Sequence, residues 1–111
     1  VPMNRGILAT CYARPAAGAD LSTASLLDLL RQRWAGEPFV VVTDGSPSTK
    51  ATLGTNAVHV TARFDPRTQT VIALAAIDNL AKGASGGAVQ AGYVALGSPE
   101  PAGLQRVAVA P

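Results

Sequence analysis

The stretch AVHVTARFDPRTQTVIALAAI, residues 57–77, decides the fold of this chain. Every second residue of its first part is apolar, namely Val58, Val60, Ala62 and Phe64. This alternation is typical of a strand with one buried face. A turn follows at 65–68, Asp-Pro-Arg-Thr, where proline sets φ at the second position and the aspartate can accept a backbone hydrogen bond. The β-rich run 70–77 then returns, so we predict an antiparallel hairpin.

Three further elements are predicted upstream of the hairpin. Residues 6–12, GILATCY, form a strand, and since both of its faces are mostly apolar, we expect it to be buried on both sides. Residues 22–34, STASLLDLLRQRW, form a helix with a leucine stripe at helical spacing. Either Asp20 or Ser22 caps this helix by accepting an N–H bond from its first turn. Residues 39–43, FVVVT, form a short strand.

Downstream, small residues predict a second helix over 87–96 that stops at Gly97. The tail after it contains two early prolines, so we expect it to run extended over a surface. The elements together predict one α+β domain over 1–111. Its sheet is mixed or mainly antiparallel, with about four strands and helical cover on one face, and the other face is left for something else.

Composition excludes several classes of function. The 111-residue chain is 48% hydrophobic and 14% charged, which favours a globular fold. Its net charge is only +2, and its scattered cations form no basic stripe, so we expect no nucleic-acid partner. No apolar run approaches the roughly 20 residues that span a bilayer, so we expect no membrane association. One cysteine excludes an internal disulfide and fits a cytoplasmic protein. The chain begins VPMNRG without an initiator methionine, and we expect a piece of something longer.

The reactive side chains do not form a catalytic set. Cys11 lies in the middle of the predicted strand 6–12, where we expect it to be buried and inert. His59 is the only histidine, on the polar face of its strand beside Thr61 and Arg63, and a structural role is favoured. The alternative, a general base, has no evident nucleophile to serve. No cysteine or carboxylate stands at ligand spacing from His59, so we predict no metal site.

The glycine-rich stretch DNLAKGASGGAVQ, residues 78–90, raises the question of a ligand. It lacks the spacing of a phosphate loop, since Lys82 precedes the glycines. Glycines before a helix nevertheless expose N–H groups at the positive end of the helix dipole. A ligand contact and a plain helix start both remain open, with the helix start favoured. Asn56 is either a turn residue, which is favoured, or a ligand contact, and Arg5 is either solvated or directed at a carboxylate or phosphate.

Three ordered motifs carry a resemblance to a known family. They are VPMNRGILAT at 1–10, LGTNAVHV at 53–60 and AAIDNLAKGASGGAVQ at 75–90. The chain closely resembles the carboxyl-terminal part of N-acetyl-γ-glutamyl-phosphate reductases over essentially its whole length. The resemblance implies a glyceraldehyde-3-phosphate-dehydrogenase-like C-terminal domain that serves substrate binding and forms a homo-oligomer through its sheet.

The resemblance also implies an activity. The family reduces N-acetyl-γ-glutamyl phosphate to its semialdehyde with NADP in arginine biosynthesis, through a cysteine thiolate and a thioester. By resemblance, Asn79 approaches the nicotinamide carboxamide, while Lys82, Gly83 and Gly86 shape the helix start beside the cofactor. Arg5 and Asn56 are the substrate-side candidates. The 82–97 helix would pack on a Rossmann NADP domain that this chain lacks.

The chain departs from the family pattern in its catalytic residues. The family's nucleophile and base segments belong before the point where this chain starts. Cys11 and His59 lie in different motifs and inherit neither role, so we predict no catalytic residue in this chain and no activity for it alone. Two alternatives stay open: an N-acetyl-aminoadipyl-phosphate reductase of lysine biosynthesis, and a non-catalytic dimerisation module.

Overall fold

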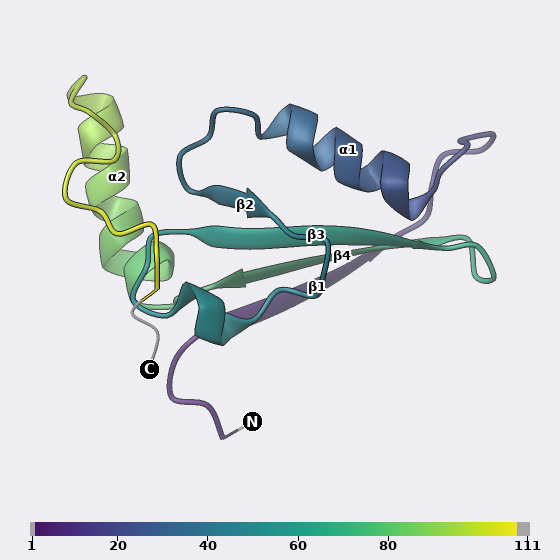
Figure 1. Ribbon diagram of the computed structural model, residues 1–111, viewed down its shortest axis with the longest axis horizontal. Helices are drawn as coiled ribbons and strands as arrows, with labels where there is room; N and C mark the ends of the chain where they lie inside the picture. Colours follow the sequence, from purple (N-terminus) through teal and green to yellow (C-terminus); the bar gives the residue numbers. More distant parts are fainter. Residues whose placement is uncertain (1, 109–111) are drawn as a thin grey trace.

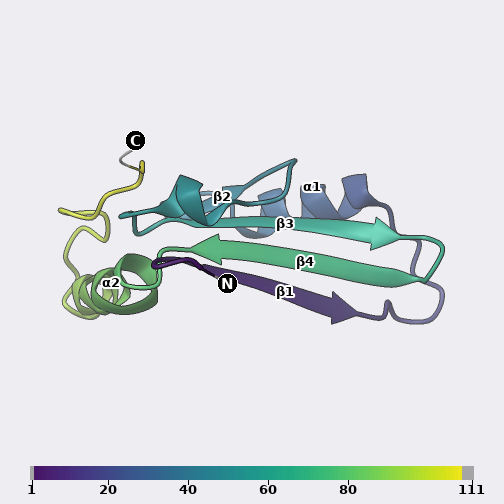
Figure 2. The same ribbon diagram turned by 90° about the horizontal axis from the view of Figure 1, so that it is seen from below.

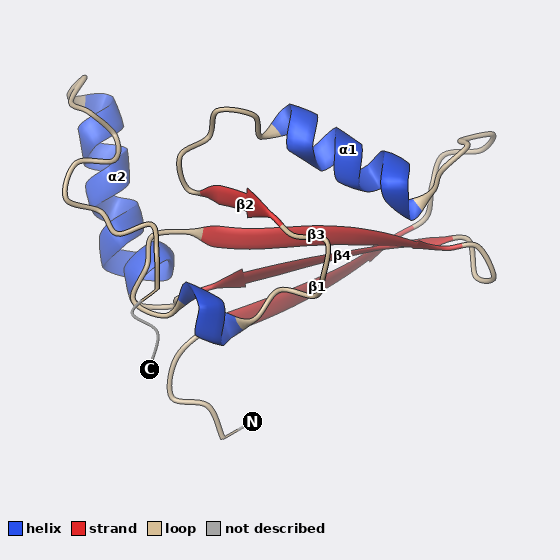
Figure 3. Ribbon diagram, viewed as in Figure 1, coloured by secondary structure: helices blue, strands red, loops and turns tan. Residues whose placement is uncertain are grey.

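The computed structural model describes residues 2–108 (Figure 1). In chain order, its elements are β1 (Ile7–Ala13), α1 (Thr23–Arg33), β2 (Val40–Val42), a 3-10 turn η1 (Thr49–Thr52), β3 (Val58–Asp65), β4 (Thr70–Ile77), a π-helical turn η2 (Ala81–Ser85) and α2 (Gly86–Ala95) (Figure 3). Each predicted strand and helix is present within a few residues of its expected bounds. The predicted tail ends in residues 109–111, which lie outside the described part of the chain.

The four strands form one sheet in the order β1-β4-β3-β2. The predicted hairpin is confirmed, because β3 and β4 pair antiparallel from Val58 opposite Ile77 to Asp65 opposite Thr70. Strand β1 pairs antiparallel with the other side of β4, and β2 pairs parallel with β3. The sheet is therefore mixed and mainly antiparallel, and the α+β class predicted from the sequence is confirmed.

Helix α1 covers one face of the sheet over β2 and β3 (Figure 1). Its leucine stripe places Leu26 and Leu27 in the core. Ser22 is the N-cap, since its side chain accepts the N–H of Ser25, and this decides between the two capping candidates. The hydroxyl of Thr23 accepts the N–H of Phe64 and so joins the start of α1 to the hairpin.

Helix α2 stands at the end of the sheet and not over a face (Figures 1 and 2). Helical structure begins earlier than the predicted residue 87, because η2 precedes α2 without a break. The chain leaves the helix at Gly97, whose φ of 67° lies in the left-handed region, as predicted. Among residues 2–108, no helix is long and apolar enough to cross a membrane.

Strand β1 corrects one expectation. It was predicted to be buried on both faces, yet all seven of its residues are exposed. The reason is its position at the sheet edge, where α1 does not reach (Figure 2). The expectation that Cys11 is buried is wrong for the same reason, since its thiol is exposed. An apolar sequence indicates that a strand can be buried, but it does not indicate which helix or strand would cover it.

Candidate functional site

The six residues predicted for a site gather at one end of the sheet. There β4 ends, and β1 and β3 begin beside it. Arg5 and Asn56 each lie two residues before a strand, β1 and β3 respectively, and Asn79 lies two residues after the end of β4. Lys82 and the two glycines of the set belong to the helical turns that come next. The antiparallel pairing of the sheet therefore unites three segments that are far apart in the sequence.

Asp78 lies at the centre of this cluster, with a side chain that has no exposed area. Its carboxylate accepts a hydrogen bond from Arg5 Nη2, which lies 2.8 Å from each of its oxygens. It also accepts the N–H of Gly54 at 2.7 Å. The N–H groups of Leu80 and Ala81 donate to the same carboxylate at 2.8 Å each. Asp78 thus caps the helical turn that follows it and also hydrogen-bonds to the segment before β1 and to the segment before β3.

These donors keep Asp78 ionised. Burial alone would raise the pKa of its carboxyl, but the Arg5 guanidinium and the three backbone N–H donors lower that pKa well below its ordinary value. The side chain of Arg5 keeps a relative exposure of 37%. Arg5 lines a cavity of about 220 Å³ together with a second cationic residue, Lys50 of η1.

Asn79 is held by the backbone of the segment that bears Arg5. Its Oδ1 accepts the N–H of Gly6 at 2.7 Å. That bond fixes the orientation of the amide, so that Oδ1 faces β1 and Nδ2 points away from it. Within residues 2–108, Asn79 Nδ2 donates no hydrogen bond to a protein acceptor. The nitrogen is therefore a donor that is oriented by the fold and still available to a ligand.

A second hydrogen-bonded group joins Asn56 to α2 through Gln90. The side-chain oxygen of Gln90 accepts Asn56 Nδ2 at 2.8 Å and Lys82 Nζ at 2.6 Å. Its nitrogen donates to Glu100 of the C-terminal segment. The backbone N–H of Asn56 donates to the carbonyl of Gln105, which brings the same segment against the start of β3. Two of the predicted residues, Asn56 and Lys82, thus share one acceptor.

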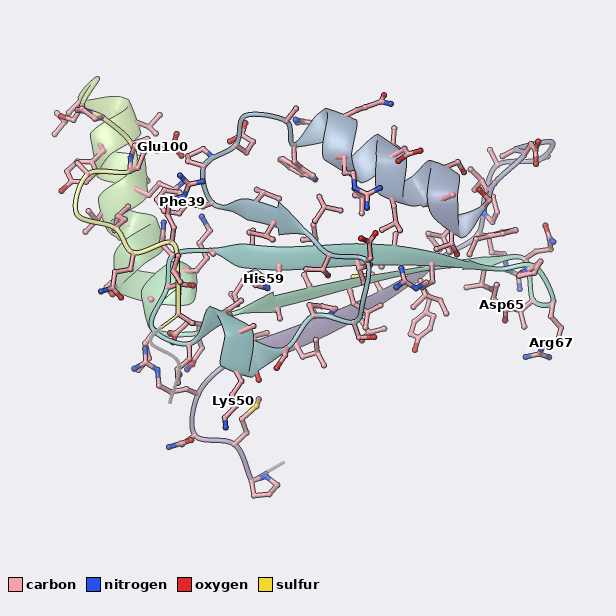
Figure 4. All side chains as sticks on the ribbon, viewed as in Figure 1. Phe39, Lys50, His59, Asp65, Arg67 and Glu100 are labelled. Atoms are coloured by element: carbon pink, nitrogen blue, oxygen red, sulfur yellow. The ribbon has the colours of Figure 1, made fainter. Side chains whose placement is uncertain are left out.

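Lys82 lies in a partly desolvated position. Its Nζ is 5.5 Å from the centroid of the Phe39 ring, which Figure 4 shows beside Glu100 near α2. Burial lowers the pKa of Lys82, and the nearby charge of Glu100 opposes that effect in part.

The two predicted glycines differ in what their surroundings require. Gly86 is buried, and a Cβ at that position would lie 2.5 Å from Asn56 Oδ1 and 2.9 Å from the carbonyl oxygen of Ala81. Only glycine therefore allows α2 to approach Asn56 this closely. Gly83 is exposed, and a Cβ there would meet its nearest neighbours at 3.4 Å, an ordinary contact.

Comparison with known proteins agrees with this architecture. Residues 1–79 match the profile of the family described as semialdehyde dehydrogenase, dimerisation domain. The match covers more than half of the chain, from the Arg5 segment to Asn79. The chain belongs to the semialdehyde dehydrogenase dimerisation-domain family.

Several relatives of this family member carry one name, N-acetyl-gamma-glutamyl-phosphate reductase. The relative from Acidothermus cellulolyticus is 49% identical over 99% of this chain and 32% of its own length. The one from Frankia casuarinae is 50% identical over the same shares. The one from Bradyrhizobium sp. strain BTAi1 is 49% identical over 100% of this chain and 33% of its own length. The chain therefore spans about a third of the length of these relatives.

Neither reactive side chain of this semialdehyde dehydrogenase family member belongs to the cluster. Cys11 lies on the edge strand β1 opposite Ala73, four residues along the strand from Ile7, which corresponds to about 13 Å. His59 points to the face opposite α1 (Figure 4), and burial lowers its pKa. Among residues 2–108, no group of three or more histidine, cysteine, aspartate or glutamate side chains could hold a metal ion.

Sequence reasoning missed three members of the cluster: Asp78, Gln90 and Glu100. A signal for Asp78 is present in the sequence, since an aspartate at the end of an apolar strand, three residues before a helical turn, can accept backbone N–H groups at the start of that turn. Gln90 and Glu100 carry no comparable signal. Gln90 joins the cluster because α2 lies beside Asn56, and Glu100 joins it because the segment after α2 folds back alongside that helix (Figure 1).

Proposed function

We propose that this chain is the carboxyl-terminal portion of an NADP-dependent N-acetyl-γ-glutamyl-phosphate reductase of arginine biosynthesis. The observation that carries the proposal is the convergence of Arg5, Asn56, Asn79 and Lys82 on one end of the sheet, around Asp78. Identity near 49% to reductases of that name, over the whole chain, supports it. Such an enzyme consumes an acyl phosphate, NADPH and a proton, and releases a semialdehyde, NADP⁺ and phosphate.

The geometry supports two proposed roles. Asn79 Nδ2, oriented by the bond from Gly6 to Oδ1, suits the carbonyl oxygen of a nicotinamide carboxamide. Arg5 and Lys50, on two walls of the cavity of about 220 Å³, suit a phosphate or carboxylate group of the substrate. NADP, when bound, supplies the hydride. Lys82, Gly83 and Gly86 would shape the helical turn beside it, and Asn56 would position the substrate side.

The remaining parts of the enzyme are proposed to lie elsewhere. Cys11 lies about 13 Å along β1 from the cluster, which supports an acyl-accepting thiol in another segment. We propose that the helical region 82–97 packs on a Rossmann NADP domain, because Val89, Val94 and Leu96 of that region are exposed here. A cytoplasmic location fits the single cysteine.

We also propose that a second copy of the chain binds the sheet face opposite α1. Leu8 and Tyr12 lie on that face of β1, with 51% and 71% of their surfaces exposed. Ile72 and Leu74 extend the same face along β4 by register. Figure 2 shows no helix over β1 on this face, with α1 behind the sheet, while η1 contacts part of β4. The family description as a dimerisation domain supports the proposal.

A chimera tests the proposed activity. This chain replaces the matching third of the Acidothermus cellulolyticus reductase, and phosphate-dependent NADP reduction is measured with N-acetyl-glutamate semialdehyde. We expect activity in the chimera and none in the 111-residue chain alone. A folded chimera without activity would overturn the assignment, with the intact relative as positive control. Activity in the chain alone would refute the claim that the catalytic thiol lies elsewhere.

A further inference from the structure

Among residues 2–108, the carboxylate of Asp78 is the side-chain group whose hydrogen bonds join all three segments of the site. Arg5 donates to it from the segment before β1, Gly54 from the segment before β3, and the turn after β4 donates through two N–H groups. The side chain has no exposed area, so no ligand can reach it while these contacts hold. Any effect of Asp78 on a reaction must therefore pass through the groups that it holds.

Each segment held by Asp78 carries residues of the proposed site. The first carries Arg5 and also Gly6, whose N–H orients Asn79. The second continues from Gly54 to Asn56. The third begins with Asn79 and continues to Lys82. Because each contact is charge-assisted, it is stronger than a hydrogen bond between neutral groups and more sensitive to geometry. Displacing the carboxylate would release substrate-side and cofactor-side groups together.

We propose that Asp78 is a positioning residue for the reaction, which sets Arg5 toward the cavity and fixes the turn that bears Asn79 relative to the start of β3. The inference rests on the proposed function. Arg5 donates to the Asp78 carboxylate through Nη2, and this contact fixes the orientation of the guanidinium. The arrangement cannot be replaced by a neutral amide, because an asparagine has one acceptor oxygen and would turn its NH₂ group toward another donor.

The sequence offers a matched control at the far end of the sheet. Asp65 also caps a turn, since its carboxylate accepts the N–H of Arg67 at 3.0 Å and the hydroxyl of Thr68 at 2.7 Å. Figure 4 shows Asp65 at the hairpin tip, remote from the cluster around Phe39 and Glu100. Asp65→Asn therefore makes the same chemical change at a structural cap without touching the site.

The kinetic test uses the active chimera at a temperature where every variant is folded by circular dichroism. We expect Asp78→Asn to raise the KM for N-acetyl-glutamate semialdehyde by about tenfold or more, the effect of losing a charged hydrogen bond. Asp65→Asn should leave kcat and KM unchanged. Arg5→Met should raise the same KM, and the double variant Arg5→Met with Asp78→Asn should raise this substrate KM little further, since the effect of Asp78 on the substrate side passes mainly through Arg5.

Unchanged kinetics in a folded Asp78→Asn chimera, or fully additive effects with Arg5→Met, would overturn the positioning role. If Asp78→Asn does not fold, Asp78→Glu takes its place, because it keeps the charge but moves the carboxylate by one methylene. The expected result is again a raised KM, and an unchanged one would overturn the inference. An inactive unsubstituted chimera would instead reject the proposed function and not this contact network.

Amide hydrogen exchange in the 111-residue chain tests the network without any activity. We expect Asp78→Asn to speed exchange at Gly6, Gly54, Leu80 and Ala81 together. Asp65→Asn should speed exchange at Arg67 and leave those four amides unchanged. Faster exchange confined to Leu80 and Ala81 would show that Asp78 caps only its own turn, which would overturn the inference.

Discussion

At the scale of single residues, close approach of the backbone decides the identity of Gly86. A Cβ there would lie 2.5 Å from Asn56 Oδ1, an atom that is buried and accepts no hydrogen bond within the described residues. The neighbouring carbonyl of Ala81 leaves no room on the other side, at 2.9 Å. The glycine-rich stretch is therefore required by packing at this position, whatever ligand lies beside it.

Gly86→Ala should lower the free energy of unfolding by about 1–3 kcal/mol, the usual range for an overpacked site. The measurement is urea unfolding of the 111-residue chain. Gly92→Ala is the control in the same helix, because a Cβ there meets nothing within 4 Å. That control should be neutral or stabilising by up to about 1 kcal/mol, as expected for glycine replaced in a helix. A neutral Gly86→Ala would contradict the contact with Asn56.

His59 should make stability depend on pH between about 7 and 5. Burial lowers its pKa in the folded chain, so the unfolded chain binds the proton more readily. The free energy of unfolding should therefore be fully maintained above the unfolded pKa and fall as the pH drops through it. His59 is the only histidine, so His59→Gln should remove this dependence. Urea titrations at several pH values check it, and a rise in stability toward pH 5 would contradict it.

At the scale of elements, α1 is specified locally and then attached by tertiary contacts. Its start is a capping box in which Ser22 and Ser25 satisfy each other's N–H groups. Its buried stripe then packs on β3, and Thr23 bonds to the end of that strand. Cap and stripe are both visible in the sequence, which is why this helix was predicted closely.

Ser22→Ala should cost about 1 kcal/mol, typical of a lost N-cap. Thermal or urea unfolding of the 111-residue chain measures it. Ser46→Ala is a suitable control, because Ser46 lies in an exposed loop and makes no side-chain hydrogen bond among the described residues. Equal stability of the two variants would show that another residue caps α1.

Helix α2 illustrates the opposite case. The sequence suggested a start at 87, whereas helical structure begins at Ala81. The difference arises because the carboxylate of Asp78 accepts the N–H groups of Leu80 and Ala81, which lets a π-helical turn precede α2. Arg5 keeps that carboxylate ionised, and Arg5 is 73 residues away in the sequence. A pattern of neighbouring residues cannot predict a partner that is so distant in the sequence.

At the scale of the whole molecule, the sheet is covered unevenly. Helix α1 lies over β2 and β3, while β1 is exposed along its full length. Large apolar side chains therefore remain in contact with water, and burying them would be favourable by about 25 cal/mol per Å². This imbalance is the physical basis for proposing a second copy on the face opposite α1.

Leu8→Lys combined with Tyr12→Lys should convert a dimer of the active chimera into monomers, because burying two ammonium groups without partners is strongly unfavourable. Sedimentation velocity over a range of protein concentrations measures the change. Leu29→Lys is the control, since Leu29 is 60% exposed on α1, away from that face. A dimer that persists in the double variant would place the interface elsewhere.

The sequence by itself determined the strands, the two helices, the hairpin and its turn, because alternation, capping residues and turn residues act within a few positions of one another. It also carried the motifs that place the chain in its family. Only the tertiary structure decided that β1 is an exposed edge, that Cys11 is exposed with it, and that Asp78, Gln90 and Glu100 organise the cluster. These outcomes depend on which segments meet across the sheet. The hydrogen bond between Arg5 and Asp78, for example, joins residues that are too far apart along the chain for any local sequence pattern to predict it.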